Sequence, residues 1–137
     1  MYKFQKLKVY QKGLEYLDLL YGISEKLPED EKYNLKSQLL RAGTSIVLNI
    51  AEGSTGQSDL EQSRFLSIAI AMRSYLETVS CLDIAELRKY FTHEKLKAIR
   101  AFGHNLFISL VAFRKSLKNN EYKVSDGLEK YSDETGD

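Results

Sequence analysis

Five polar residues recur along one side of a segment that is otherwise rich in leucine and isoleucine: Gln38, Arg41, Ser45, Asn49 and Glu52. Their spacing of 3, 4, 4 and 3 residues places all five on one narrow side of a helix. Such short polar groups beside a core favour hydrogen bonds across helices or subunits over a solvated face. Arg41 and Glu52 are about three helical turns apart, so we expect each to pair with another helix or a neighbouring chain. A ligand or nucleic-acid contact is the alternative interpretation of this polar stripe.

Candidates for catalytic or metal chemistry are few. The two histidines, His93 and His104, lie eleven residues apart, which is too far for one metal ion within a chain. Neither His-Glu-x-x-His nor Glu-x-x-His occurs, which disfavours a zinc protease or a di-iron bundle. The segment 53–56 lacks the lysine of a phosphate-binding loop, and Cys81, the single cysteine, is interpreted as a structural thiol. The sequence therefore predicts no enzyme, no cofactor and no metal.

Nucleic-acid binding has more support, because basic residues gather in the last long apolar segment. Lys97, Arg100 and Lys115 fall on one broad side of a predicted helix together with His104. Clusters of this kind can neutralise phosphates of RNA or DNA. The alternative is ordinary solubilising charge, which the net charge of +1 favours.

These residues must be positioned by helices, since the chain has only one proline and few glycines. Apolar periodicity predicts four of them, over residues 7–26, 31–52, 59–88 and 93–118. Pro28 ends the first, Gly53 is expected to stop the second in a left-handed cap, and Thr92 is the predicted N-cap of the fourth. Short connections between helices of similar length predict an all-α fold, an antiparallel up-down four-helix bundle.

One apolar series in each predicted helix is expected to form the core. The first helix contributes Leu7, Tyr10, Leu14, Leu17 and Tyr21, and the second contributes Leu35, Leu39, Ala42, Ile46 and Ile50. The third contributes Phe65, Ile68, Ala69, Met72, Leu76, Val79 and Leu82, and the fourth Leu96, Ile99, Phe102, Leu106, Leu110, Phe113 and Leu117.

More apolar residues remain than one small bundle can bury. Leu66 and Ile70 fall off the core series of the third helix, and Ile108 and Val111 fall off that of the fourth. The second helix also has apolar residues off its core series, namely Leu40, Val47 and Ala51. Contiguous exposed apolar residues mark interaction surfaces, so Leu66, Ile70, Ile108 and Val111 predict a homo-oligomer interface. A few exposed leucines on a monomer are the alternative.

Composition predicts one domain over residues 1–118 and a polar tail over 119–137, expected to be disordered. The tail holds six acids and two bases, which leaves a charge of +5 on the rest of the chain. No window approaches the roughly 20 apolar residues of a membrane span, and the start lacks the apolar run of a secretion signal. A cytoplasmic location without a membrane partner is the expectation.

The segment 38–53, with Gln38, Arg41, Gly43, Asn49 and Gly53, resembles the signature of the bacterial four-helix-bundle proteins encoded in intervening sequences of 23S rRNA genes. Residues 65–78, the opening 4–12 and Leu27-Pro28 also fit, so the resemblance covers about residues 3–118. The resemblance implies a ring-shaped assembly, typically a pentamer. A similar architecture is implied for accessory proteins of diversity-generating retroelements, which bind nucleic acid and a reverse transcriptase. A scaffold or binding module of unknown role is therefore the leading hypothesis, and a nucleic-acid-binding accessory protein is the second.

Overall fold

The computed structural model describes residues 1–55 and 61–121, and these fold into four long helices without a strand. The helices are α1 (Lys8–Ser24), α2 (Leu35–Thr55), α3 (Glu61–Leu87) and α4 (His93–Glu121). Two 3-10 turns, η1 (Lys3–Lys6) and η2 (Glu29–Glu31), precede α1 and α2. The predicted tail falls outside the described residues from position 122 onward.

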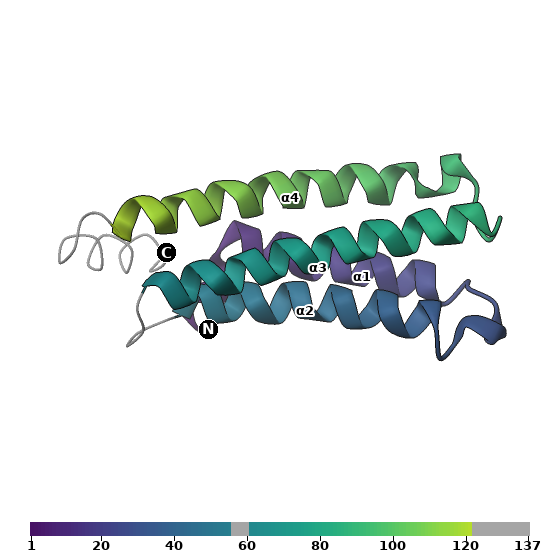
Figure 1. The fold of residues 1–137 in the computed structure, drawn as a ribbon, viewed down its shortest axis with the longest axis horizontal. Helices are drawn as coiled ribbons and strands as arrows, with labels where there is room; N and C mark the ends of the chain where they lie inside the picture. Colours follow the sequence, from purple (N-terminus) through teal and green to yellow (C-terminus); the bar gives the residue numbers. More distant parts are fainter. Residues whose placement is uncertain (56–60, 122–137) are drawn as a thin grey trace.

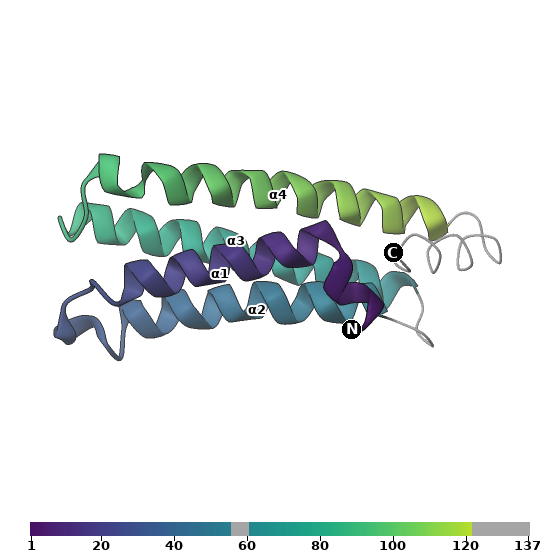
Figure 2. The ribbon, with the colours of Figure 1, turned by 180° about the vertical axis from the view of Figure 1, so that it is seen from behind.

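The helices lie side by side in an antiparallel bundle, which confirms the predicted fold class (Figures 1 and 2). α1 packs against α2 and α4, and α3 packs against the same two helices, so α1 and α3 occupy opposite corners of the bundle. As a result, the edge formed by α1 and α2 lies opposite the edge formed by α3 and α4.

Local chemistry sets the helix ends. Thr92 caps α4 as predicted, because its hydroxyl oxygen accepts a hydrogen bond from the Lys95 backbone N–H at 3.1 Å. Lys89 follows α3 with a φ of 64°, and the Tyr90 N–H bonds the Ala85 carbonyl across it at 3.0 Å. A left-handed residue after the helix thus turns the chain back toward α4.

The predicted stop at Gly53 is wrong, because α2 continues through it to Thr55 with no left-handed glycine among the described residues. Gly53 serves close packing instead. A Cβ atom there would lie 2.6 Å from Ile68 Cδ1 and 3.1 Å from the Arg64 carbonyl oxygen. Only the absence of a side chain lets α2 and α3 approach at this level.

The core matches the prediction in α2 and largely in α4, but not in α1. All five predicted α2 residues are buried, and so are Leu96, Leu106 and Leu110 of α4. In α1 the buried residues are Val9, Gly13, Tyr16, Leu20, Ile23 and Ser24. The predicted Leu14 and Tyr21 are 44% and 46% exposed. Because α1 carries two apolar series, the sequence pattern alone did not identify the one that faces inward.

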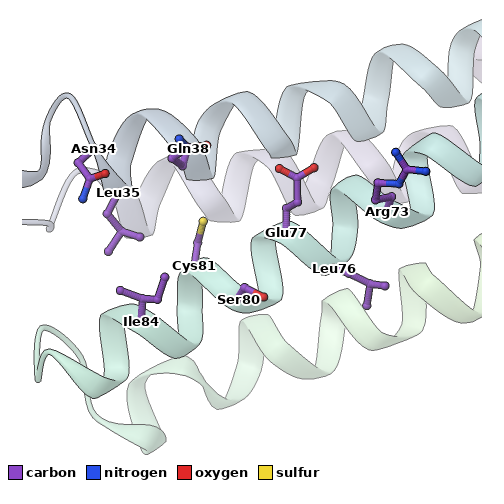
Figure 3. A pocket seen from close by; sticks show the side chains of 9 residues that line it. All are labelled: Asn34, Leu35, Gln38, Arg73, Leu76, Glu77, Ser80, Cys81 and Ile84. Atoms are coloured by element: carbon purple, nitrogen blue, oxygen red, sulfur yellow. The ribbon is translucent and has the colours of Figure 1, made fainter.

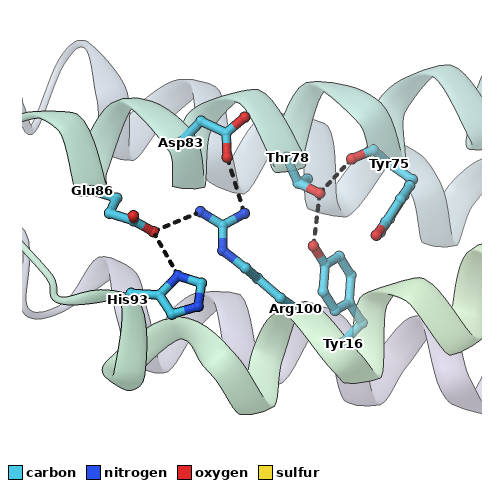
Figure 4. Close-up of polar contacts among 7 residues, drawn as sticks. All are labelled: Tyr16, Tyr75, Thr78, Asp83, Glu86, His93 and Arg100. Atoms are coloured by element: carbon cyan, nitrogen blue, oxygen red, sulfur yellow. Dashed lines mark hydrogen bonds and ion pairs between the residues drawn. The ribbon is translucent and has the colours of Figure 1, made fainter.

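The inward side of α3 contains several polar residues, although the sequence predicted an apolar series there. Arg64, Ser67, Ser74 and Thr78 are buried, whereas the predicted core residue Leu76 is exposed. Thr78 shares a 2.8 Å hydrogen bond with the Tyr16 hydroxyl and donates to the Tyr75 carbonyl at 2.6 Å (Figure 4). Val47 of α2, predicted to point away from the core, is buried against α1 near Gly13.

Candidate functional site

The polar stripe of α2 lies along its boundary with α3, and three of its members contact α3 or one another there. The Arg41 guanidinium bonds Gln38 and forms an ion pair with Glu77 of α3 at 3.3 Å. Ser45 Oγ accepts a hydrogen bond from Ser74 Oγ at 2.9 Å. These contacts join two helices of one chain.

The other two members of the stripe have different environments. The Asn49 side-chain amide donates to the Ser45 carbonyl at 2.9 Å and to its hydroxyl at 3.2 Å. Glu52 is exposed, and its carboxylate forms no ion pair within the described residues. The stripe is therefore divided between contacts within the bundle and a solvent-facing carboxylate.

A shallow groove runs between α2 and α3 beside this stripe (Figure 3). Glu77 and Cys81 point from α3 toward α2, whereas Leu76 points away from α2. The groove is lined by Asn34, Leu35, Gln38, Arg73, Leu76, Glu77, Ser80, Cys81 and Ile84. Its mixture of one thiol, an ion-paired carboxylate and aliphatic groups offers contacts for binding.

Cys81 places a thiol, the strongest potential nucleophile among its lining residues, in the groove. Its side chain is buried, and burial, followed by the nearby Glu77 carboxylate, raises the pKa of the thiol above its ordinary value. The reactive thiolate is thus disfavoured at neutral pH. Cys81 acts as a packing residue of the α2/α3 boundary, in line with the interpretation from sequence.

The basic residues predicted to bind nucleic acid are split between an ion-pair cluster and open surface. Arg100 bonds Asp83 at 3.1 Å and Glu86 at 3.3 Å, and Glu86 also lies 3.7 Å from His93 (Figure 4). Because two carboxylates of α3 neutralise its guanidinium, Arg100 is not available to a phosphate in this conformation. Lys97, His104 and Lys115 are exposed on α4.

Three of the four residues predicted to form an oligomer interface are strongly exposed. Leu66, Ile70 and Ile108 are 54%, 42% and 54% accessible, and Val111 is half-buried. The contacts of Tyr75 with Phe107 and of Arg114 with Phe65 bring these parts of α3 and α4 together. Leu66 and Ile70 lie on the outward side of α3, together with Arg73 and Glu77, whereas Ile108 and Val111 lie on α4.

A second apolar surface was missed by the sequence analysis, which assigned Leu14 and Tyr21 to the core and did not consider Leu48. It combines Leu14 and Tyr21 of α1 with Leu48 of α2, which is 62% exposed. The signal was present in the sequence as a second apolar series in residues 7–26, but two series at helical spacing cannot be ranked without knowing where α2 lies.

Two described segments are long and apolar enough to cross a membrane by length and composition alone: Gln62–Leu87 and His93–Leu117. The sequence analysis had expected none. Within the most apolar stretch of each, 44% and 28% of residues are buried in the bundle. Several of the remaining apolar residues, among them Phe102, Phe107 and Phe113, are partly buried against the core.

Among residues 1–55 and 61–121, no group of three or more histidine, cysteine, aspartate or glutamate side chains is arranged to hold a metal ion. The described residues define a helical-bundle protein with polar contacts between helices and exposed apolar edges. The model of the 23S rRNA-intervening sequence protein family matches residues 5–110, and the chain belongs to this family.

A solved structure supports the same assignment. The chain is similar to a protein of unknown function from the S23 ribosomal protein family of Bacteroides thetaiotaomicron VPI-5482. The two share 27% identity and a TM-score of 0.70, over 78% of this chain and 98% of the other. No curated protein matches this chain.

Proposed function

We propose that this protein is a non-catalytic, cytoplasmic scaffold or binding module that works as a homo-oligomer. The observation that carries the proposal is the exposure of Leu66 and Ile70 on α3 and of Ile108 on α4. Fully burying an exposed side chain of this size releases roughly 1.5–3 kcal/mol, and covering the remaining half of each releases correspondingly less. Family likeness supports a closed ring, with five copies as the expected number.

A second copy of the chain fits the outward side of α3 better than a lipid bilayer does. Arg73 and Glu77 lie on the same outward side of α3 as Leu66 and Ile70, as the helical repeat of about 100° per residue requires. Charged groups are costly in hydrocarbon but acceptable in a protein interface with polar neighbours.

Light scattering after gel filtration tests this proposal directly. We expect the wild-type chain to elute with a mass several times that of one chain. Ile70→Glu together with Ile108→Glu should reduce the mass to that of one chain, because each carboxylate would be buried without a partner. A single-chain mass for the wild type at all accessible concentrations would refute the proposal.

A second candidate function, as an accessory protein acting with RNA or a reverse transcriptase, is favoured by the exposed Lys97 and Lys115 on α4. A ring would repeat these charges around its axis, and multivalency would raise the affinity for phosphates. RNA binding that disappears with added salt and weakens on Lys97→Glu with Lys115→Glu would support this function. Absence of binding at low salt would reject it.

A further inference from the structure

A cluster of lysines lies at the end of the bundle where α1 begins (Figure 2). Its members, named the lysine cluster, are Lys3 and Lys6 of η1 and Lys8 of α1. Residues 1–14 contain no acid that could neutralise them. All three side chains are exposed, and none forms an ion pair or hydrogen bond with another described residue. Their charge is therefore available to an anionic partner.

The 3-10 geometry of η1 separates its charged side chains from its apolar ones. Because a 3-10 helix repeats every three residues, Lys3 and Lys6 lie on one line, about 6 Å apart along the axis. Phe4 and Leu7 share a different line, and both are half-buried where η1 packs against α1 and α2. The two lysines are thus held toward solvent while their apolar neighbours anchor the segment.

Tyr2 places an open aromatic ring beside these lysines. Its side chain is 76% exposed, and its ring stacks on that of Phe4 with 6.2 Å between the centroids and 18° between the planes. Phe4 in turn meets the ring of Tyr10 edge-on at 5.1 Å, which ties the pair to α1. With most of its surface exposed, the Tyr2 ring can receive a second planar group on the face turned away from Phe4.

Hydrogen bonds fix this segment before any partner arrives. The Tyr2 backbone N–H donates to Gln5 Oε1 at 2.7 Å, and the Gln11 side-chain amide donates to the Gln5 carbonyl at 3.3 Å. The Leu7 N–H bonds the Phe4 carbonyl at 3.1 Å. A site that is already ordered loses less conformational entropy on binding, so even a few contacts can contribute to affinity.

Positive charge beside an open aromatic ring is the chemistry that recognises single-stranded nucleic acid. The bases of a single strand present their faces for stacking on aromatic side chains, while basic groups follow the phosphates. In a duplex the bases are already stacked and paired, so the Tyr2 ring would gain no partner there.

The exposed lysines of α4 fit a short strand less well. Lys97 and Lys115 are eighteen residues apart, which is about 27 Å along a helix. The exposed Ile108 lies between them on α4. The lysine cluster, in contrast, falls within six residues and has an aromatic ring next to it.

An anionic membrane surface is a poorer match for this end of the bundle. Attachment to a bilayer surface requires apolar side chains that are free to insert beside the basic ones. Phe4 and Leu7 are turned toward the bundle, and the Phe4 ring contacts Tyr10. The structure therefore favours a ligand that needs one aromatic face over a ligand that needs several apolar side chains.

We infer that η1 and the start of α1 form a binding site for single-stranded RNA or DNA. Tyr2 stacks on a base, and the lysine cluster contacts the phosphates on either side of it. The inference rests on the second candidate function and adds the surface and the strandedness of the ligand. Each copy in an assembly contributes one such site, so a strand long enough to reach two copies binds more tightly.

Titration of a labelled oligouridylate of about ten nucleotides, followed by fluorescence anisotropy at low salt, tests the role of Tyr2. Tyr2→Ala should weaken binding by roughly five- to hundredfold, the effect of losing one aromatic stacking partner. Tyr2→Phe keeps the ring and should bind like the wild type. Tyr33→Ala is the matched control, because Tyr33 is 87% exposed and precedes α2 at the opposite end of the bundle. This control should not change the affinity.

The salt dependence of the same titration tests the lysine cluster. Lys3→Gln with Lys6→Gln should reduce the slope of log affinity against log salt by about 1–2, because two phosphate contacts are lost. Lys26→Gln with Lys95→Gln removes the same charge from the end of α1 and the start of α4, where both lysines are exposed. This control should leave the slope unchanged. Light scattering and circular dichroism should show the wild-type mass and helicity for every variant.

A photocrosslink identifies the stacking residue directly. Irradiation of the complex with an iodouridine-containing strand, followed by peptide mass spectrometry, should label Tyr2. A duplex of the same length should bind more weakly than the single strand. Equal affinity for the two forms, together with an unchanged affinity for Tyr2→Ala, would overturn the inference.

The remaining outcomes separate this site from the second candidate function. If Lys97→Glu with Lys115→Glu weakens RNA binding while the variants of Tyr2, Lys3 and Lys6 bind normally, the site at η1 is overturned and the second candidate function stands on α4. Binding to vesicles that contain phosphatidylserine, without binding to RNA, would overturn both in favour of a membrane surface. If neither polyanion binds at low salt, both fail together, and the proposed homo-oligomer is unaffected.

Discussion

The boundary between α2 and α3 and the boundary between α3 and α4 are built from residues of different size. At the first, Gly53 faces Ile68 and Ser45 bonds Ser74, so the two backbones approach closely. At the second, Tyr75 stacks near Phe107 at 5.2 Å between ring centroids, and Arg100 spans to Asp83 and Glu86.

This difference shows that one helix can meet two neighbours at different distances, with the spacing set by side-chain length. Short side chains make contacts that depend on the backbone position, so an added methyl group causes a clash that only a backbone shift can relieve. Long side chains can adjust their rotamers, so the same disturbance is spread over several bonds. The α2/α3 boundary should therefore be the more sensitive of the two.

Gly53→Ala should produce the largest effect, a loss of about 1–3 kcal/mol in the free energy of unfolding. The new Cβ would lie 2.9 Å from Ile68 Cγ1 as well as close to the Arg64 carbonyl. Gly22→Ala is the matched control, because nothing lies within 4 Å of its position. That substitution should stabilise the chain by roughly 0.5–1 kcal/mol. Urea unfolding of both variants measures the contrast, and equal effects would mean that the close approach does not exist.

Tyr16→Phe should cost about 0.5–1.5 kcal/mol, because it removes the hydrogen bond to Thr78 but leaves that hydroxyl bonded to the Tyr75 carbonyl. Tyr21→Phe is the control, since Tyr21 is exposed on the same helix. Chemical unfolding at neutral pH compares the two. A cost for Tyr21→Phe as large as that for Tyr16→Phe would contradict the role of the Thr78 hydrogen bond.

Tyr16 should also make the bundle sensitive to alkali. Burial raises the pKa of its phenol well above the ordinary value of 10.0. A raised pKa in the folded state means that its contribution is fully present below about pH 10 and is lost as the pH rises toward the folded-state pKa. The wild type should therefore lose stability above pH 10 more steeply than Tyr16→Phe, as followed by circular dichroism. Parallel curves would exclude this residue as the cause.

Arg100→Gln, at the α3/α4 boundary, should lower the free energy of unfolding by about 0.5–1 kcal/mol. Arg41→Gln, at the α2/α3 boundary, should lower it by less than about 0.5 kcal/mol. The Arg100 side chain is 26% exposed and contacts two carboxylates, whereas that of Arg41 is 61% exposed and contacts one. Thermal unfolding at low and high salt ranks the two. A larger effect for Arg41→Gln would contradict this ranking of the two ion pairs by exposure and number of partners.

Tyr90→Phe should have the smallest effect, confined to the end of the bundle. The Tyr90 hydroxyl donates to Glu31 at 2.7 Å, and this bond, followed by one from Asn34, lowers the pKa of the Glu31 carboxyl. Because the pKa of Glu31 is lower in the folded state, its ionised carboxylate stabilises the fold at pH values above the ordinary pKa of 4.5. This contribution is lost as the pH falls through the folded-state pKa. The small difference between wild type and Tyr90→Phe at pH 7 should therefore vanish in acid. A difference that persists at pH 2 would point to lost packing instead.

The amino-acid sequence by itself determined the number of helices, their order and their antiparallel arrangement. Those features follow from periodicity, from Pro28 and from the cap at Thr92, all of which act within a few residues along the chain. It also determined the main core series of α2, from Leu35 to Ile50, although Val47, which lies off that series, is buried as well. The exposure of Leu66, Ile70 and Ile108 was predictable for the same reason, since each lies off the core series of its helix.

Only the tertiary structure decided the rotation of α1 and the role of Gly53. In α1 two apolar series compete, and the choice between them depends on where α2 and α4 lie, which no local signal encodes. Gly53 was expected in a left-handed cap, but Ile68, fifteen residues further on, explains why glycine is required there. The partners of Arg41 and Arg100 were likewise undetermined, because an ion pair between helices depends on register and on the spacing that neighbouring side chains allow.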